Sequence, residues 1–178
     1  LPFSIGLVRR HCIGVDPYYL VHKAKELQYH TKMINSGRYV NDSMGRYIGK
    51  KVVKKIISQG KNILGAHVLV MGMTFKENVS DIRNSKVADI INEFKDFGAE
   101  VDVMDPFASP LEVLQEYGIR LVERPGKKYD AVVVAVAHTT YLKLDESYFM
   151  SITNEHAVLA DVKGVYRGSI HQMIYWSL

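Results

Sequence analysis

Cysteine is almost absent from this sequence, since Cys12 is the only one among 178 residues. A single cysteine cannot form an internal disulfide, which excludes the disulfide-stabilised class of small secreted domains and favours a reducing, cytoplasmic location. The sequence also lacks an apolar run near the ~20 residues that a membrane-spanning helix requires, and no signal peptide opens it. We therefore expect no membrane partner.

A strong excess of charge of one sign is also lacking, because the formal net charge is only +4. The densest basic cluster falls in a helical pattern and consists of Lys50, Lys51, Lys54 and Lys55. No aromatic stacking platform accompanies it, so we interpret it as a solvated helix face and expect no nucleic-acid partner. With 47% hydrophobic and 24% charged residues, the composition is that of a globular protein with a substantial core.

The first third of the sequence, from about Tyr18 to Gln59, has a helical pattern that predicts a short helix followed by a long one. The long helix would run from Thr31 to Gln59 and measure roughly 40 Å at ~1.5 Å per residue. Its apolar side is formed by Met33, Gly37, Val40, Met44, Ile48, Val52 and Ile56. Because Tyr47, Val53 and Ile57 form a second line, the helix needs partners on more than one side. A dimer contact and packing against a missing upstream portion are both open.

Beyond residue 60 the pattern changes to alternating strands and helices, which predicts an α/β fold with a parallel, Rossmann-like sheet. We expect strands at 66–73, 100–105, 129–137 and 157–162, the last being the final strand. Helices are expected at 85–98, 109–118 and 145–152, with Ser109 as N-cap and Pro110 at the first helical position. The predicted domains are therefore residues 1–60 and residues 61–178.

The three glycines of a dinucleotide-binding loop are missing after the first predicted strand. A G-x-G-x-x-G turn lets the backbone approach a pyrophosphate, but only Gly72 is present here. A long charged insertion with Lys76 and Arg83 takes its place, at the sheet edge where ligands bind in parallel folds. Both cations are candidate anion contacts; the alternative is an exposed loop with a surface pair between Asp81 and Arg83. Asp105, after the second strand, is either a ribose-binding acid or a turn residue.

Several motifs resemble the UDP-glucose/GDP-mannose dehydrogenase family, most closely its bacterial branch that oxidises UDP-N-acetylhexosamines for surface polysaccharides. They are "LVRRHCIGVDPYYL", "GRYVNDSMGRYI", "MGMTFKENVSDIRNSKV", "MDPFA", "ADVKGVY" and "YWSL". The resemblance runs along nearly the whole chain, but only to the central dimerisation region and the C-terminal UDP-sugar-binding domain of the family. Because the chain begins with Leu1 and not methionine, we expect a fragment whose N-terminal NAD-binding domain lies upstream. NAD is then the implied cofactor, a UDP-sugar the implied substrate and a homodimer the implied assembly; no metal ligand is predicted.

The resemblance implies that Cys12 is the catalytic nucleophile of a two-step oxidation of a primary alcohol to a carboxylate. A thiolate adds to the intermediate aldehyde, the resulting thiohemiacetal is oxidised to a thioester, and water releases the acid. Asp16 matches the family aspartate assigned to water activation or proton transfer, and four residues on one helical turn would place it on the same side as Cys12. His11 could assist thiol activation. Without the resemblance, a lone cysteine is more often buried packing.

The resemblance also implies a set of substrate-binding residues: Lys76, Arg83, Arg38 and Lys163. Arg38 lies with Asn41 on the long helix, and Lys163 lies in "DVKG". Tyr18 and Tyr19 are either core residues or sugar contacts. For His138, which follows a buried strand, a fold-supporting hydrogen bond is expected before a uridine contact.

The sequence departs from the family at Arg9 and Arg10, where the family pattern usually has two glycines. Long cationic side chains could obstruct the approach of that loop to the sugar, so either the loop is altered or this copy of the enzyme is impaired. The alternatives to a dehydrogenase fragment are a free-standing nucleotide-sugar-binding module and a dimerisation domain.

Overall fold

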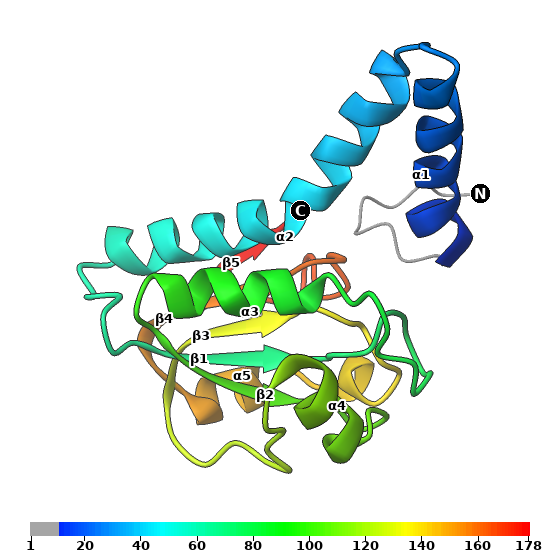
Figure 1. Ribbon diagram of the computed structural model, residues 1–178. Coiled ribbons are helices and arrows are strands. Elements are labelled where there is room, and N and C mark those ends of the chain that lie inside the picture. Colours follow the sequence, from blue (N-terminus) through cyan, green and yellow to red (C-terminus); the bar gives the residue numbers. More distant parts are fainter. Residues whose placement is uncertain (1–10) are drawn as a thin grey trace.

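The computed structural model describes the backbone of residues 11–178 and the side chains of residues 16–178 (Figure 1). The helices and strands follow one another in this order: α1 His11–Glu26, α2 Lys32–Ser58, β1 His67–Met71, α3 Val87–Asp96, β2 Glu100–Met104, α4 Pro110–Tyr117, β3 Tyr129–Val134, the 3₁₀ turn η1 Tyr141–Lys143, α5 Glu146–Ile152, β4 Thr153–Asp161 and β5 Ile174–Ser177. None of the described helices is both long enough and apolar enough to span a membrane.

The strands form one parallel sheet in the order β2-β1-β3-β4-β5, which confirms the predicted α/β class. The chain moves outward from β1 to β2 and then returns to place β3 on the other side of β1. The strand order therefore reverses between β1 and β3, the position where ligands bind in open parallel sheets. The prediction that 157–162 is the final strand is wrong, because β5 adds to the edge of β4. A four-residue, half-buried edge strand is too short to show a clear pattern.

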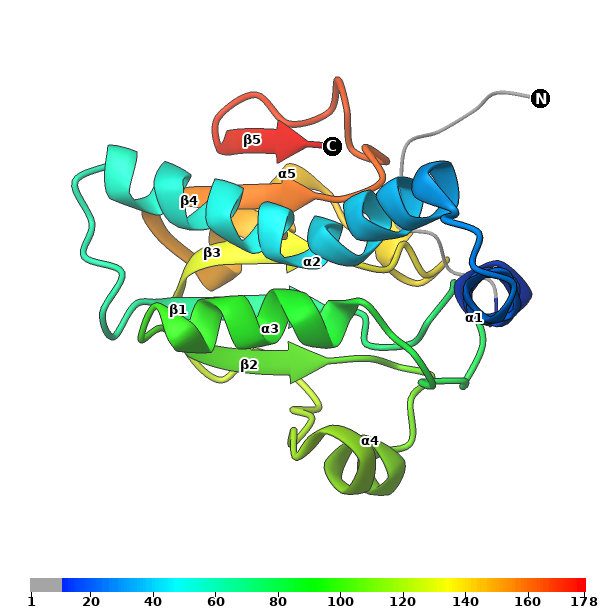
Figure 2. The ribbon, with the colours of Figure 1, turned by 45° about the horizontal axis from the view of Figure 1, so that its top comes forward.

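Side chains alternate between the two faces of the sheet, as the pleat requires. Val68 and Val70 of β1 belong to the core on the face covered by α2 and α3. Leu69 and Met71 belong to the second core, on the face covered by α5 (Figure 2). Burial on both faces explains why the central strands consist of nearly continuous apolar residues.

The two halves of α2 have different environments. Its C-terminal half contributes Ile48, Val52 and Ile56, all fully buried against the sheet. Its N-terminal half projects beyond the sheet beside α1, and there Met33 is 90% exposed and Tyr39 76% exposed (Figure 1). The predicted long helix is confirmed to within one residue at each end.

The packing of α2 against α3 depends on two glycines one helical turn apart. A Cβ atom at Gly45 would lie 2.6 Å from the Cβ of Asp89, and one at Gly49 would lie 2.8 Å from the Cβ of Glu93. Both distances are too short for carbon atoms, so the two helices approach too closely for any side chain at these positions.

The start of α1 differs from the expectation. A helical pattern was expected from about Tyr18, whereas α1 begins at His11 and continues through Pro17. Proline has no backbone N–H and is usually found at a helix boundary, yet here it lies inside the helix. The helix persists and gives up the hydrogen bond that residue 17 would otherwise donate. Elsewhere the predicted cap is confirmed: Ser109 accepts from the backbone N–H of Glu112, and Pro110 opens α4.

Candidate functional site

The loops at the carboxyl edge of the sheet form the candidate site. The insertion 72–86 leaves β1, the segment 135–140 leaves β3, and the segment 162–173 leaves β4. All three begin on the same edge because the strands are parallel. Lys76, a candidate anion contact, and Lys163, which the resemblance implied as a substrate contact, lie on two of these segments.

Gly72 has a structural role in this arrangement. Its φ of +94° is in the region that favours glycine, and an added Cβ would lie 2.4 Å from the Cβ of Val136. The absence of a side chain at Gly72 therefore allows the segments that follow β1 and β3 to pack closely against each other. Gly72 is not part of a phosphate-binding turn.

A buried carboxylate joins the ends of β1, β2 and β3. The side chain of Asp105 is fully buried and accepts hydrogen bonds from His138 and from four backbone N–H groups. These backbone donors and their distances to the carboxylate are Met73 at 2.6 Å, Thr74 at 3.0 Å, Phe107 at 2.8 Å and Ala108 at 3.0 Å. Of the two roles expected for Asp105, the structure supports the turn residue. It does not support the ribose-binding acid.

The tautomer of His138 follows from its partners. Nδ1 accepts from the backbone N–H of Asn78 at 3.0 Å, so the hydrogen is on Nε2, which donates to Asp105 at 3.0 Å. The hydroxyl of Thr74 lies 3.3 Å from the same Nε2 and donates to the carbonyl of Lys76. Although an Asp–His–hydroxyl set resembles a hydrolase triad, both contacts meet on one nitrogen and the imidazole is fully buried. The imidazole therefore ties the insertion to β3, as the fold-supporting interpretation expected.

The pKa of Asp105 reflects two opposing influences. Burial alone would raise it, but the hydrogen bonds from His138 and from the backbone of Met73, Thr74 and Phe107 favour the carboxylate more strongly. The net effect lowers the pKa of Asp105 from 3.8 to about 2. Because Asp105 stays ionised, it keeps its hydrogen bonds to the segments that follow β1, β2 and β3, and these bonds stabilise the observed arrangement of the segments.

Lys163 forms an ion pair with Glu77, at 2.6 Å between Nζ and Oε1. Glu77 lies on the insertion after β1 and Lys163 after β4, so the pair connects two loops on either side of β3. Lys76, on the same insertion, is exposed. Sequence reasoning did not identify Glu77, because its partner is distant along the chain.

Asp161 shapes the turn that carries Lys163. Its buried carboxylate accepts from the backbone N–H groups of Gly164 at 2.9 Å and Tyr166 at 2.8 Å, and from the hydroxyl of Tyr175 at 2.9 Å. The "DVKG" motif thus contains both the cation and the residue that fixes its turn. Asp161 was therefore the residue from which the sequence could have indicated this turn.

Arg83 forms the surface pair that was the alternative to ligand binding. Its Nε and terminal nitrogen donate to the two carboxylate oxygens of Asp81 at 3.0 and 2.8 Å, and its side chain is 73% exposed. It borders a pocket of about 450 Å³ that also contains Glu112 and Glu116. Two further carboxylates make this pocket unfavourable for an anion, so the geometry supports Arg83 less well than Lys76 or Lys163.

Arg38 lies at the junction of α1 and α2. Its guanidinium carbon is 4.6 Å from the centroid of the Tyr18 ring, and one nitrogen lies 3.2 Å from Oδ1 of Asp42. The ring of Tyr18 is 49% exposed and that of Tyr19 73% exposed, so neither tyrosine is a core residue.

Both candidate catalytic residues fall within α1. Helix geometry places residues four apart, such as 12 and 16, on one face of the helix. Asp16 is exposed. The side chains of His11 and Cys12 lie outside the described residues, as do Arg9 and Arg10.

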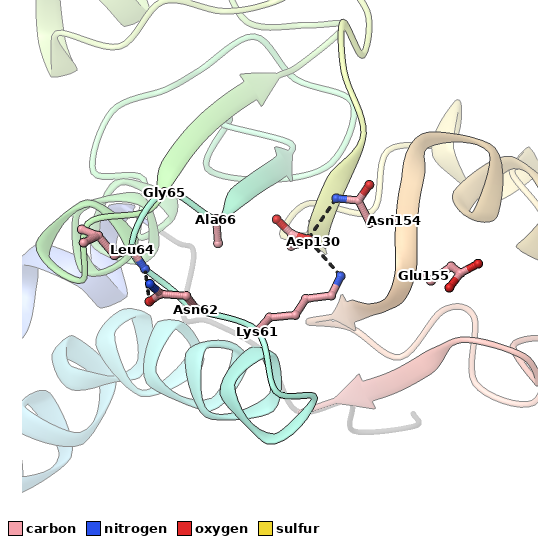
Figure 3. A pocket seen from close by; sticks show the side chains of 8 residues that line it. All are labelled: Lys61, Asn62, Leu64, Gly65, Ala66, Asp130, Asn154 and Glu155. Atoms are coloured by element: carbon pink, nitrogen blue, oxygen red, sulfur yellow. Dashed lines mark hydrogen bonds and ion pairs between the residues drawn. The ribbon is translucent and has the colours of Figure 1, made fainter.

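A second pocket, of about 430 Å³, lies at the opposite edge of the sheet (Figure 3). Lys61 and Asn154 point toward Asp130, and each donates to its carboxylate at 2.9 Å; the backbone N–H of His67 donates at 3.1 Å. These groups satisfy one another and tie the loop after α2 to the starts of β1, β3 and β4. This is a structural cluster at the amino ends of the strands. Among the side chains of 16–178, no group of three or more His, Cys, Asp or Glu is arranged to hold a metal ion.

Comparison with known proteins gives close relatives. The UDP-N-acetyl-D-glucosamine 6-dehydrogenase of Pseudomonas aeruginosa is 43% identical over 92% of this chain and 39% of its own length. Protein CapL of Staphylococcus aureus is 42% identical over 93% of this chain and, again, 39% of its own length. The chain therefore spans about 39% of the length of these curated relatives.

Solved structures agree with the fold. The UDP-N-acetyl-mannosamine dehydrogenase Cap5O of S. aureus superposes with a TM-score of 0.73 at 27% identity, covering 98% of this chain and 38% of that one. The NDP-N-acetyl-D-galactosaminuronic acid dehydrogenase of Methanosarcina mazei superposes with a TM-score of 0.83 over 99% of this chain and 39% of that one; at 22% identity it supports the fold alone. Residues 69–168 match the family described as "UDP-glucose/GDP-mannose dehydrogenase family, UDP binding domain". Because this match covers more than half of the chain, from β1 through β4, and contains the insertion 72–86 and the buried Asp105, the chain belongs to the UDP-glucose/GDP-mannose dehydrogenase family.

Proposed function

We propose that this chain is the central and C-terminal part of an NAD-dependent nucleotide-sugar 6-dehydrogenase. Its substrate would be a UDP-N-acetylhexosamine, or UDP-glucose, oxidised to the uronic acid for surface polysaccharide synthesis in the cytoplasm. The match of residues 69–168 to the UDP binding domain of the family carries the proposal. The similarity to UDP-N-acetyl-D-glucosamine 6-dehydrogenase supports the hexosamine.

The UDP moiety is proposed to bind at the carboxyl edge of the sheet. Lys76 is exposed on the insertion, and Lys163 is held over the same edge by the turn of Asp161. Both would contact the phosphates, while the carboxylate of Glu77 would be exchanged for phosphate oxygens at Lys163. Arg38 and Arg83 remain proposed contacts, with Arg38 acting from the helical segment.

The described residues do not fit NAD. A pyrophosphate-binding turn needs glycines that leave room for the ligand, whereas the space beside Gly72 is filled by Val136. We propose that NAD is bound mainly by an N-terminal domain of a longer chain.

In the proposed chemistry, the residues of α1 handle the aldehyde intermediate. The Cys12 thiolate forms a bond to the carbonyl carbon, and the carbonyl oxygen takes a proton to give a thiohemiacetal. Oxidation of that carbon to a thioester would release the hydroxyl proton and transfer the hydride to NAD held by the N-terminal domain. Asp16 then accepts a proton from water as the water attacks the thioester. The carboxylate product then leaves and the thiolate is restored.

Calorimetric titration of this chain with UDP tests the binding site. We expect binding, and a loss of about tenfold in affinity for Lys76→Ala and for Lys163→Ala, because each removes a charged contact to phosphate. Lys95→Ala, at an exposed lysine on α3, is the matched control and should bind as the parent does. An Arg9→Gly/Arg10→Gly variant separates a blocked entrance from an absent site. If that variant is folded and fails to bind UDP, the proposed site is wrong.

The proposed assembly is a homodimer formed through residues 1–60. The exposed large apolar residues of α1, of the first half of α2 and of the connection between them support it: Tyr19, Leu20, Leu27, Met33, Tyr39 and Val40. Several exposed large apolar residues on one helical segment are typical of an interface. The domain division at residue 60 belongs to this same proposal.

A further inference from the structure

One carboxylate, that of Asp42, receives contacts from α1, from α2 and from the residue that precedes α3. The hydroxyl of Tyr18, on α1, donates to Oδ2 at 2.5 Å. Arg38, one turn earlier on α2, donates to Oδ1 at 3.2 Å. Lys86, the residue that precedes α3, places Nζ 3.1 Å from the same oxygen and 3.5 Å from Asp89. The set formed by Tyr18, Arg38, Asp42 and Lys86 is called the Asp42 cluster below.

The charges of the Asp42 cluster depend on Asp42 itself. Partial burial alone would raise the pKa of this carboxyl, but the Tyr18 hydroxyl, Lys86 and Arg38 outweigh that effect and lower the pKa below its ordinary value. Asp42 is therefore an anion that separates two cations. Without it, the ammonium of Lys86 and the guanidinium of Arg38 would face each other, and the Tyr18 hydroxyl would lose its acceptor.

Little else that the structure describes fixes the direction of α1. Among the described helices and strands, the main packing partner of α1 is α2 (Figure 1). Tyr18, Tyr19 and Leu20 on its surface are all about half exposed or more. The described side chains of α1, from Asp16 onward, thus bury little apolar surface, and in this part the orientation of the helix depends on specific polar contacts.

The Asp42 cluster also lies where the two parts of the proposed site meet. Cys12 lies between one and two turns before Tyr18 on α1, and Asp16 lies within the same turn as Tyr18. Lys86 closes the insertion that carries Lys76. Asp42 thus connects the helix of the nucleophile with the loop proposed to bind phosphate.

We propose that Asp42 is a positioning residue, which fixes α1, and with it Cys12 and Asp16, relative to the insertion at the carboxyl edge of the sheet. The catalytic purpose of this contact rests on the proposed function. A misplacement of about 1 Å between a reacting group and its substrate can cost on the order of 10²-fold in rate. An orienting carboxylate far from the reacting atoms can therefore control turnover.

A distance measurement tests the positioning directly. In a Cys12→Ser background, spin labels at Lys25→Cys on α1 and Lys95→Cys on α3 report how α1 lies relative to the sheet domain, by pulsed electron paramagnetic resonance. Labelled chains are diluted with unlabelled chains so that only distances within one chain contribute. We expect one narrow distance distribution for this background and a clearly broader or shifted one for Asp42→Ala.

Two further variants keep the test decisive. Asp96→Asn, at an exposed aspartate of α3, is the matched control and should leave the distribution narrow. Tyr18→Phe removes only the hydroxyl that joins α1 to Asp42, so it should broaden the distribution even if Asp42→Ala fails to fold. An unchanged distribution in folded Asp42→Ala would overturn the proposal. If Asp42→Ala does not fold, an unchanged distance distribution in Tyr18→Phe would overturn the proposal instead.

Kinetics of the longer chain separate this inference from the proposed function. Asp42→Asn should lower kcat by about tenfold or more while KM for the UDP-sugar stays within about twofold, since the phosphate contacts are intact. If KM rises and kcat is unchanged, the catalytic purpose assigned to Asp42 is wrong. If Cys12→Ser retains full turnover, the proposed function is wrong. The distance measurement would still test the orientation of α1, because it does not depend on catalysis.

Discussion

At the residue scale, Cys12 is the position whose substitution distinguishes a nucleophile from a packing residue. In the longer chain, Cys12→Ser should abolish net conversion to the acid, because a serine hydroxyl has a far higher pKa and attacks an aldehyde poorly. The first oxidation needs no bond to sulfur, so aldehyde or a slowly released ester should accumulate and be detected by mass spectrometry. Asp16→Asn should instead leave a thioester on Cys12. Full turnover by the serine variant would mean that Cys12 only packs.

Asp105 gives a prediction about acid stability. Its pKa is lowered to about 2 in the folded chain from 3.8, so its contribution is present above about pH 4 and is lost as the pH falls through about 2. The difference corresponds to about 2 kcal/mol of unfolding free energy. Asp105→Asn should therefore destabilise the chain by about that amount at neutral pH, as measured by urea unfolding.

The pH series supplies the control for Asp105. Other carboxyls with lowered pKa values, such as Asp42 and Asp130, titrate in both proteins, so only the difference between parent and variant reports Asp105. That difference should shrink toward zero as the pH approaches about 2. A constant difference from neutral to acid pH would contradict the assigned charge of Asp105.

Residue identity in the site was only partly predictable from the sequence. Position at a strand end indicated the insertion and Lys76, and a likeness of motifs indicated Lys163. The partners that orient these cations were not predictable, because Glu77 meets Lys163, and Asp42 meets Tyr18 and Lys86, across long separations in the chain. Such contacts depend on how helices and loops fold back, and no local pattern encodes them.

At the element scale, the contact of α2 with α3 can be tested with matched glycine substitutions. Gly45→Ala places a methyl group against Asp89 and should cost about 1–3 kcal/mol of unfolding free energy. Gly37→Ala, in the same helix, meets nothing within 4 Å and should stabilise the chain by about 0.5–1 kcal/mol through helix propensity. Thermal unfolding followed by circular dichroism measures both. Equal effects of the two substitutions would rule out a close helix approach.

Elements with strong periodicity and capping signals were the predictable ones. The limits of α2 followed from its apolar spacing, and those of α4 from Ser109 and Pro110. Prediction was wrong where the apolar pattern was weak or the segment was short. The first turns of α1 precede the helical pattern that begins near Tyr18, and the four residues of β5 offer too few positions for a period.

At the scale of the whole molecule, the proposed homodimer makes a direct prediction. Light scattering at about 20–50 µM should give twice the mass of one chain, because a dimer would cover the large apolar residues that α1 and the first half of α2 leave exposed. Tyr39→Glu combined with Met33→Glu should yield monomers that keep the parent circular dichroism spectrum. A monomeric parent would refute the assignment of this face.

The parallel pairing of β5 with β4 has a consequence for how this domain can be divided. With β5 in place, β4 is an inner strand whose residues 157–161 are all buried. A shortened piece that stops in 162–173 would turn β4 into an edge, with a row of unpaired backbone groups beside Val158, Leu159 and Ala160. Such an edge is a template for strand addition by another copy, and hence for aggregation. The short strand β5, which gave the weakest sequence signal, thus pairs with the backbone groups of β4 and prevents β4 from pairing with a strand of another chain.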